Sequence, residues 1–322
     1  MRPPGAEEQT MLQSVRDIVA GYLRMKSIRK HRTRLGRDLA PKYSNYLDAA
    51  RARTGITDVL PAELSGQAEQ FRAEGWAAFN PASSQELAAS MWSKIRAQEE
   101  QGLAVWDADS RYALGDIYRQ FPEVDRLFQS ELGGFLRACY GANFKIFYGV
   151  CYKSEFDPAG ASGSQLWHAD GGPGTCINLM WCLSPVSREN GAMECLPWTD
   201  TLRIFESEKA LRRERRKQPA GKSGRDILCE HYEKEIQRHF NDHIIQPNGG
   251  SGLLFAFSNN LIHKGGYPQP GHERYVCVFH IYPSAVPTPF ERYRSAGIAK
   301  TGSFPKDPAF QDNEPVPQGI AQ

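Results

Sequence analysis

The feature that most constrains this chain is a series of short apolar runs between Asn143 and Tyr282, separated by glycine, proline and asparagine. Runs of this length, rich in β-branched and aromatic residues and bounded by turn residues, predict β-strands. Several such strands in succession indicate an antiparallel double sheet or barrel. The expected strands cover 144–152, 176–183, 192–196, 252–257 and 274–282.

Helices are expected beside these strands. A short helix should end at Gly75 and lead into a strand, and Ser83 with Glu86 has the spacing of a capping box for a helix through about residue 101. A second amphipathic pattern covers 124–140 and ends at Gly141, a residue that favours the left-handed conformation of a helix C-terminus. We expect these helices to cover one side of a sheet, so the predicted fold class is mainly β with flanking helices.

Composition divides the chain into three parts. Residues 1–60 read as a basic helical extension, 61–295 as the main domain, and 296–322 as a tail containing several prolines. A polar insertion at about 199–245 interrupts the strands of the main domain. Because a structureless loop of this length is uncommon in a compact domain, we expect two helices separated by a flexible piece. The position of the insertion in the chain, between Asp170 and His263, suggests that it acts as a lid.

Positive charge is concentrated at the N-terminus. Residues 1–53 carry twelve Lys and Arg against five Asp and Glu, whereas the whole chain has a net charge of only +2. The helix expected here is either a solvated appendage or a surface that contacts an anionic membrane or an acidic partner. Nucleic acid is not an expected partner, because no aromatic residues alternate with the basic ones as they do in a base-stacking platform.

The chain has the features of a cytoplasmic protein. The N-terminus lacks a secretory pattern, and no apolar run is long enough to span a bilayer. The seven cysteines form no CxxC pair, which predicts buried free thiols and a reducing compartment. They are Cys139, Cys151, Cys176, Cys182, Cys195, Cys229 and Cys277.

Three residues far apart in the sequence have the chemistry of a metal site. His168 and Asp170 lie two apart, so in an extended strand both side chains project from the same face. His263 follows the strand expected at 252–257. Two imidazoles and one carboxylate suit non-heme Fe(II) and leave three coordination positions open. The spacing alone also fits histidines that are simply hydrogen-bonded in a core.

Arg274 strengthens the metal interpretation, because an arginine buried in a barrel requires a carboxylate partner. With its surroundings, the chain resembles the phytanoyl-CoA dioxygenase family of Fe(II)/2-oxoglutarate oxygenases over residues 65–290. The matching pieces are Leu166–Asp170, the strand ending at Trp181, the turn 189–197, the run 252–263 and Arg274.

This resemblance implies a double-stranded β-helix, the jelly-roll core also seen in cupins. It implies His168, Asp170 and His263 as ligands of Fe(II), Arg274 as the residue that binds the distal carboxylate of 2-oxoglutarate, and Trp181 as a residue packed against that co-substrate. The chain departs from the family after Pro197, where Trp198 stands in place of the usual Pro-Gly-Ser-His continuation.

The resemblance further implies a dioxygenase that uses O2, converts 2-oxoglutarate to succinate and CO2, and hydroxylates a C–H bond of a small or medium-sized molecule. Asp170 favours hydroxylation, since family members that halogenate lack this carboxylate. Desaturation, ring closure and epimerisation remain open, as does a non-catalytic module that binds the same cofactors and docks through its N-terminal helix. His280 shares a strand face with Arg274 and is expected either to contact substrate or to be a core histidine.

Two other groups of residues can be interpreted either as functional sites or as ordinary surface features. The basic cluster at 212–217 is either a solvated helix face or, in a lid, an attraction for an anionic substrate. His239 and His243 have the spacing of a zinc pair, but without a third ligand they favour a surface helix.

Overall fold

The computed structural model describes residues 47–48, 50–52, 60–104, 106, 117–170, 176–214 and 224–284. The expected N-terminal helix and the proline-containing tail lie outside these residues. The described part contains all the strands that the sequence predicts between Asn143 and Tyr282.

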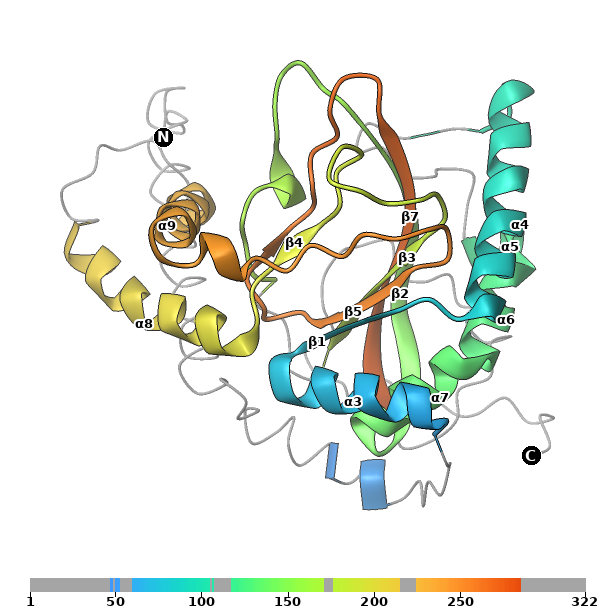
Figure 1. The fold of residues 1–322 in the computed structure, drawn as a ribbon, viewed down its shortest axis with the longest axis horizontal. Coiled ribbons are helices and arrows are strands. Elements are labelled where there is room, and N and C mark those ends of the chain that lie inside the picture. The colour runs from blue at the N-terminus through green and yellow to red at the C-terminus, as the bar shows by residue number, and fades with distance from the viewer. Residues whose placement is uncertain are drawn as a thin grey trace, which may run out of the picture.

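Antiparallel strands form two sheets (Figure 1). The large sheet has the order β1-β5-β3-β7-β2, and the small sheet pairs β4 with β6. A bridge between His168 and His263 extends the small sheet. The bounds are β1 Trp76–Phe79, β2 Asn143–Glu155, β3 Ile177–Cys182, β4 Glu194–Cys195, β5 Leu254–Ser258, β6 His263–Lys264 and β7 Glu273–Ser284.

The two faces of the large sheet have different neighbours. Leu179 of β3 and Phe279 of β7 belong to a core shared with the helices, whereas Met180, Phe255 and Val276 belong to a second core shared with the small sheet. We call the first the helix-facing side and the second the inner face. The helices that cover the sheet are α3 Ala62–Glu74, α4 Ala82–Glu100, α5 Ile117–Gln120, α6 Pro122–Gln129 and α7 Glu131–Tyr140.

Gly75 ends α3 as expected. Its φ of 82° is left-handed, and its N–H donates to the carbonyl of Phe71. A Cβ at this position would lie 2.5 Å from the indole nitrogen of Trp198, so the close approach also requires glycine. The chain can therefore turn directly from α3 into β1, which forms the edge of the large sheet.

Two details of the expected helices are wrong. Ser83 does not cap α4, because its hydroxyl donates to Glu131 at 2.6 Å and the residue before the helix is Pro81. The helix expected at 124–140 is divided at Ser130, whose backbone is extended and whose hydroxyl bonds to the carbonyl of Leu127. The first difference arises because the hydroxyl of Ser83 bonds to a residue of another helix, and the second because the hydroxyl of Ser130 bonds locally, which competes with the regular helical pattern.

The insertion contains two helices, as expected. They are α8 Trp198–Glu214 and α9 Gly224–His239, and in Figure 1 they lie on the opposite side of the molecule from α4. Ile204 of α8 and Tyr232 of α9 are buried in one core with Trp167 and Ile262. The helices are therefore a packed layer behind the small sheet. The flexible piece expected between them, at 215–223, lies outside the described residues.

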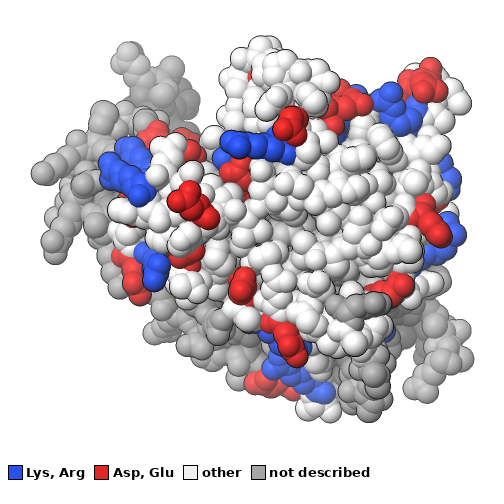
Figure 2. Space-filling view, viewed as in Figure 1, with Lys and Arg blue, Asp and Glu red and all other residues white. Residues whose placement is uncertain are grey.

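All seven cysteines are free and buried, which confirms the prediction of buried free thiols. Figure 2 shows charges of both signs mainly around the edge of the viewed face, with few in its centre. Within the described ranges, the structure has no helix that is long and apolar enough to cross a membrane.

Candidate metal centre

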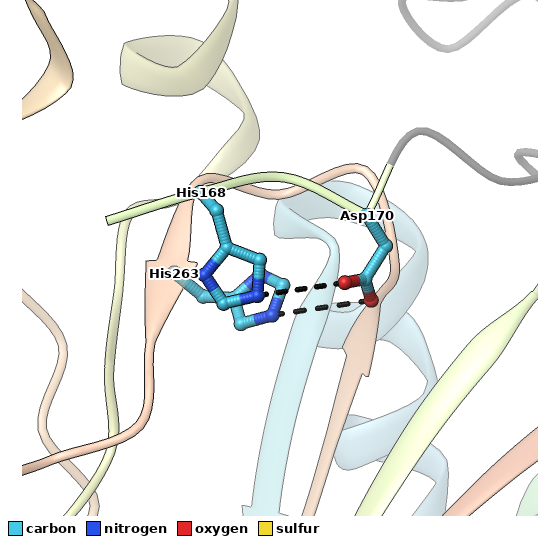
Figure 3. A group of neighbouring side chains, drawn as sticks. All are labelled: His168, Asp170 and His263. Carbon is cyan, nitrogen blue, oxygen red and sulfur yellow. Dashed lines mark ion pairs between the residues drawn. The ribbon is translucent and has the colours of Figure 1, made fainter. Parts of the chain in front are cut away.

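His168, Asp170 and His263 meet between the two sheets (Figure 3). The backbones of His168 and His263 hydrogen-bond to each other twice, each N–H to the other's carbonyl at 2.8 Å. The N–H of Asp170 donates to the carbonyl of Asn259 at 3.1 Å. Backbone bonding therefore places the two histidines side by side and brings the carboxylate to them, although His263 is far away in the sequence.

The ligand atoms lie close enough to share one ion. The three donor atoms are all within 4.8 Å of one another. Nε2 of His168 lies 3.5 Å from Oδ1 of Asp170, and Nε2 of His263 lies 3.9 Å from Oδ2. Among the described residues this is the group of His, Cys, Asp and Glu with metal-binding geometry.

Both imidazoles are held with Nε2 toward the carboxylate. Nδ1 of His168 lies 2.7 Å from the carbonyl of Leu166, and Nδ1 of His263 lies 2.8 Å from that of Leu261. A carbonyl can only accept, so each Nδ1 carries the proton. In the neutral imidazole, Nε2 is then a lone-pair donor, which is the arrangement that metal-binding histidines need.

Electrostatics also favour a cation at this point. Burial alone would raise the pKa of Asp170, but His263 and His168 outweigh it and hold that pKa well below its usual range. Burial and the neighbouring His168 lower the pKa of His263 to about 4. At neutral pH the group is thus a carboxylate with a neutral His263, which suits a divalent metal.

A row of inner-face side chains surrounds the triad. Asn178 of β3 is paired with Phe257 on one side and His280 on the other. The amide of Asn178 donates to Oδ2 of Asp170 at 2.6 Å, and the rings of Phe257 and His263 lie 4.8 Å apart. Burial lowers the pKa of His280, while the charge of Asp170 raises it. The structure therefore places His280 beside the metal group.

Asn178 was not among the site residues that we expected from the sequence. Its signal was a single polar residue inside the apolar run 176–183, eight residues after Asp170. Such a residue in a fully buried strand must have a hydrogen-bond partner. The sequence could have suggested the need for a partner, but it could not identify Asp170 as that partner.

Arg274 lies on the inner face and is only 3% exposed. Its guanidinium donates to the carbonyl of Gly191 and, at 3.4 Å, to the hydroxyl of Ser154, while Nε has no partner. Within the described ranges no carboxylate pairs with it, and burial lowers its pKa. The adjoining cavity is small, about 10 Å³, and is lined largely by apolar residues that include Met180, Met193 and Phe255.

Trp181 does not lie on the inner face. It pairs with Cys277 of β7 and is fully buried in the core that faces the helices. Because side chains alternate along a strand, Trp181 points away from the face that carries Met180 and Cys182. The expectation that Trp181 packs against a co-substrate is therefore wrong, and we assign it to the core.

Among the described residues, His239 and His243 belong to no group of three potential metal ligands. His239 ends α9, while Nδ1 of His243 lies 2.8 Å from Oδ2 of Asp200 at the start of α8. This contact ties the 3₁₀ turn Asn241–His243 to the helix layer. The plainer interpretation of these histidines is thus supported.

Comparison with known proteins gives structural likeness without close sequence relatives. No model of a known protein family matches the sequence, and no curated protein matches it. EctD from S. alaskensis, solved with 2-oxoglutarate and 5-hydroxyectoine, is 17% identical with a TM-score of 0.50, over 83% of this chain and 92% of EctD.

Two proteins of nogalamycin biosynthesis are also similar. The epimerase SnoN, solved with Fe3+, alpha ketoglutarate and nogalamycin RO, is 14% identical with a TM-score of 0.48, over 69% of this chain and 84% of SnoN. The carbocyclase SnoK is 14% identical with a TM-score of 0.47, over 68% and 83% of the two chains. The sheet topology and the similarity to EctD show that this chain is mainly β with flanking helices and has a jelly-roll core.

Proposed function

We propose that the protein is an Fe(II)- and 2-oxoglutarate-dependent dioxygenase of the phytanoyl-CoA dioxygenase family. The observation that carries the proposal is a group of two histidines and one aspartate, with both Nε2 atoms turned toward the carboxylate. A buried arginine that has no carboxylate partner within the described part of the chain lies on the same inner face. The first feature suits Fe(II), and the second suits a dicarboxylate co-substrate.

The residues fit these groups in chemical terms. His168, His263 and Asp170 would hold Fe(II), and Arg274 would bind the distal carboxylate of 2-oxoglutarate through its unpaired Nε and its terminal nitrogens. Bound there, Fe(II) with O2 and 2-oxoglutarate would supply the oxidation, in which one oxygen atom would enter succinate as CO2 leaves and the other would enter the substrate C–H bond. The protein binds and orients the reactants and excludes water from them.

On the inner face, the side chains between Arg274 and the triad of His168, Asp170 and His263 are apolar. This suits contact with the methylene groups of 2-oxoglutarate. Met180 pairs with Phe255 and Val278 there. Because the cavity of about 10 Å³ holds about one water molecule, side chains must move to admit a five-carbon acid. Met180 and Met193 are suited to this movement, since methionine is the most adaptable apolar side chain.

Hydroxylation is the reaction that we propose. The carboxylate of Asp170 occupies the position that halogenating members of the resembled family lack, and EctD was solved with a hydroxylated compound, 5-hydroxyectoine. Asp170 is held by the backbone of Asn259 and by the amide of Asn178. These two contacts hold Asp170 in place beside the two histidines.

Asn259 provides a clue to the substrate, which we propose to be a small molecule. Asn259 lies in the turn after β5, where its N–H donates to the carbonyl of Cys176 at 3.2 Å and its carbonyl accepts from the N–H of Asp170 at 3.1 Å, so it is a neighbour of the triad. Its amide is fully buried, with no partner for either polar atom among the described residues. An unpaired buried polar group costs about 1–3 kcal/mol, so we propose that substrate offers an uncharged hydrogen-bonding group here. Asn259→Leu should raise the KM for substrate and leave 2-oxoglutarate binding unchanged.

The experiment that tests the function begins without oxygen. Purified protein with Fe(II) and 2-oxoglutarate should develop a metal-to-ligand absorption band, and admission of air with candidate substrates should yield succinate. His263→Ala should lose both signals. His272→Ala is the matched control, because His272 is exposed on the turn before β7. Absence of the band in the wild type, together with no succinate from any substrate, would contradict the proposal.

A further inference from the structure

We propose that Asn178 is a positioning residue that holds Asp170 as a one-oxygen metal ligand. The contact that carries this inference is the bond of 2.6 Å from Nδ2 of Asn178 to Oδ2 of Asp170. A bond this short from an amide to an ionised acceptor is typical of charge-assisted hydrogen bonds, which are among the stronger ones in proteins. The inference rests on the proposed metal site, and the experiment below separates the two.

The orientation of the amide follows from its other contact. The thiol of Cys176 donates to Oδ1 of Asn178 at 3.5 Å. Because an ionised carboxylate can only accept, the NH2 end of the amide must be the end that faces Asp170. Both ends of the side chain are thus assigned by their partners, and Asn178 is only 2% exposed.

The two oxygens of Asp170 consequently have different surroundings. Oδ2 accepts the bond from Asn178 and lies 3.9 Å from Nε2 of His263, whereas Oδ1 lies 3.5 Å from Nε2 of His168. Because Asn178 engages Oδ2, we assign Oδ1 as the oxygen that would bind a metal together with the histidines. A carboxylate that bound through both oxygens would occupy two coordination positions of a six-coordinate ion.

The number of occupied positions matters for the chemistry. Two imidazoles and one carboxylate oxygen leave three positions, which is the number that a two-point co-substrate and O2 together need. Binding of Asp170 through both oxygens would leave two. Asn178 thus has a role that a merely buried amide would not have, because it keeps the third position open.

The strand position makes Asn178 a rigid anchor. β3 is the central strand of the large sheet, and Asn178 is paired on both sides, with Phe257 of β5 and His280 of β7. Ligand geometry is best fixed by partners on such elements, since their backbone cannot shift independently. The donor is fixed by the sheet, and Asp170 adjusts to it.

The test compares Asn178→Leu and Asn178→Ser with the control Ile177→Val. Ile177 is the preceding residue of β3 and packs on the helix-facing side, so the control disturbs the same strand without touching the metal group. Folding of each variant is checked by circular dichroism and thermal unfolding. If the leucine variant does not fold, the serine variant, which is too short to reach Asp170, decides the question.

Two affinities are measured in each folded variant. The first is the affinity for Co(II) by calorimetry, and we expect it to fall by about 10- to 100-fold in the Asn178 variants, the usual effect of losing a bond to a metal ligand. The second is the affinity of the Fe(II)-saturated protein for 2-oxoglutarate, from its absorption band. We expect a tenfold or larger loss in the Asn178 variants and none in the control.

A purely structural role would lower the unfolding temperature and leave both affinities within twofold of the wild type, which would overturn the proposal. If the wild type binds Co(II) but shows no band with 2-oxoglutarate, the proposed function fails. The role of Asn178 is then decided by the Co(II) affinities alone.

Discussion

At the scale of single residues, two backbone carbonyls determine how the histidines can act. The carbonyls of Leu166 and Leu261 each lie two residues before the histidine that they hold. Each metal-binding orientation is therefore produced by its own stretch of chain, before the third ligand is involved. Because the two rings are already oriented, metal binding has a smaller entropic cost for ordering these side chains.

Arg274 is the residue whose removal should separate co-substrate binding from metal binding. We expect Arg274→Met to weaken 2-oxoglutarate binding by about 2–4 kcal/mol, because the distal carboxylate would lose a buried charge partner. Co(II) affinity should not change, since Arg274 contacts none of the three ligands. Titration of the absorption band measures the first quantity and calorimetry the second.

Arg188→Met is the control for this prediction, because Arg188 is exposed. An unchanged affinity for 2-oxoglutarate in Arg274→Met would show that the buried guanidinium has another purpose.

Replacement of Trp181 should affect stability and not co-substrate binding, the reverse of what we expect for Arg274. Trp181→Phe should lower the free energy of unfolding by about 1–2 kcal/mol, since it removes part of a fully buried ring from the helix-facing core. The affinity for 2-oxoglutarate should stay the same. Urea unfolding and titration of the absorption band measure the two effects, and a weaker affinity would return Trp181 to the co-substrate site.

At the scale of elements, a buried carboxylate joins helices α4 and α6, which cover the helix-facing side of the large sheet. Glu123 of α6 is fully buried and accepts bonds from Lys94 at 2.5 Å and Ser90 at 2.6 Å, both on α4. Burial alone would raise the pKa of Glu123, but these two donors outweigh it and lower the pKa below its ordinary value of 4.5. The link stabilises the fold only while Glu123 is ionised.

The pH dependence of this link has a defined sign. Because the pKa is lower in the folded state, the stabilisation is present above pH 4.5 and is lost as the pH falls below it. At pH 7, Glu123→Gln should lower the free energy of unfolding by about 1–3 kcal/mol. Urea unfolding between pH 7 and pH 3 should show that difference shrinking. Glu206→Gln, at an exposed position of α8, is the control and should show no such trend.

At the scale of the whole molecule, the metal group joins three layers. Asp170 bonds to the large sheet through Asn178 and to the β5–β6 turn through Asn259. Trp167, beside His168, is buried in the core of α8 and α9. An ion that binds only when these elements are assembled would stabilise the folded state.

Metal binding should therefore raise thermal stability. At a free Co(II) concentration of 100 times its Kd, the folded state gains about 2.7 kcal/mol. For a domain of this size we expect an increase in Tm on the order of 5 °C. Differential scanning fluorimetry with and without EDTA measures it. Asp170→Asn should show little increase, and an equal increase in that variant would place the bound metal elsewhere.

Much of the fold followed from local patterns. The helix ends at Gly75 and Gly141, the strands and the two helices of the insertion depend on residues near in sequence, and the structure confirms them. The pair His168 and Asp170 is local in the same sense. The capping box at Ser83 failed because Glu131, from another helix, accepted the hydroxyl bond instead.

The sequence by itself determined the strand-rich core, its flanking helices and the chemical types of the three ligand residues. Tertiary structure alone decided that His263 lies beside His168, that Asn178 reaches Asp170 and that Trp181 turns toward the helices. The physical reason is the burial of β3, in which all six residues are buried. A strand covered on both faces has no polar alternation to mark its sides, so only the register with β5 and β7 decides which side chains face the metal group.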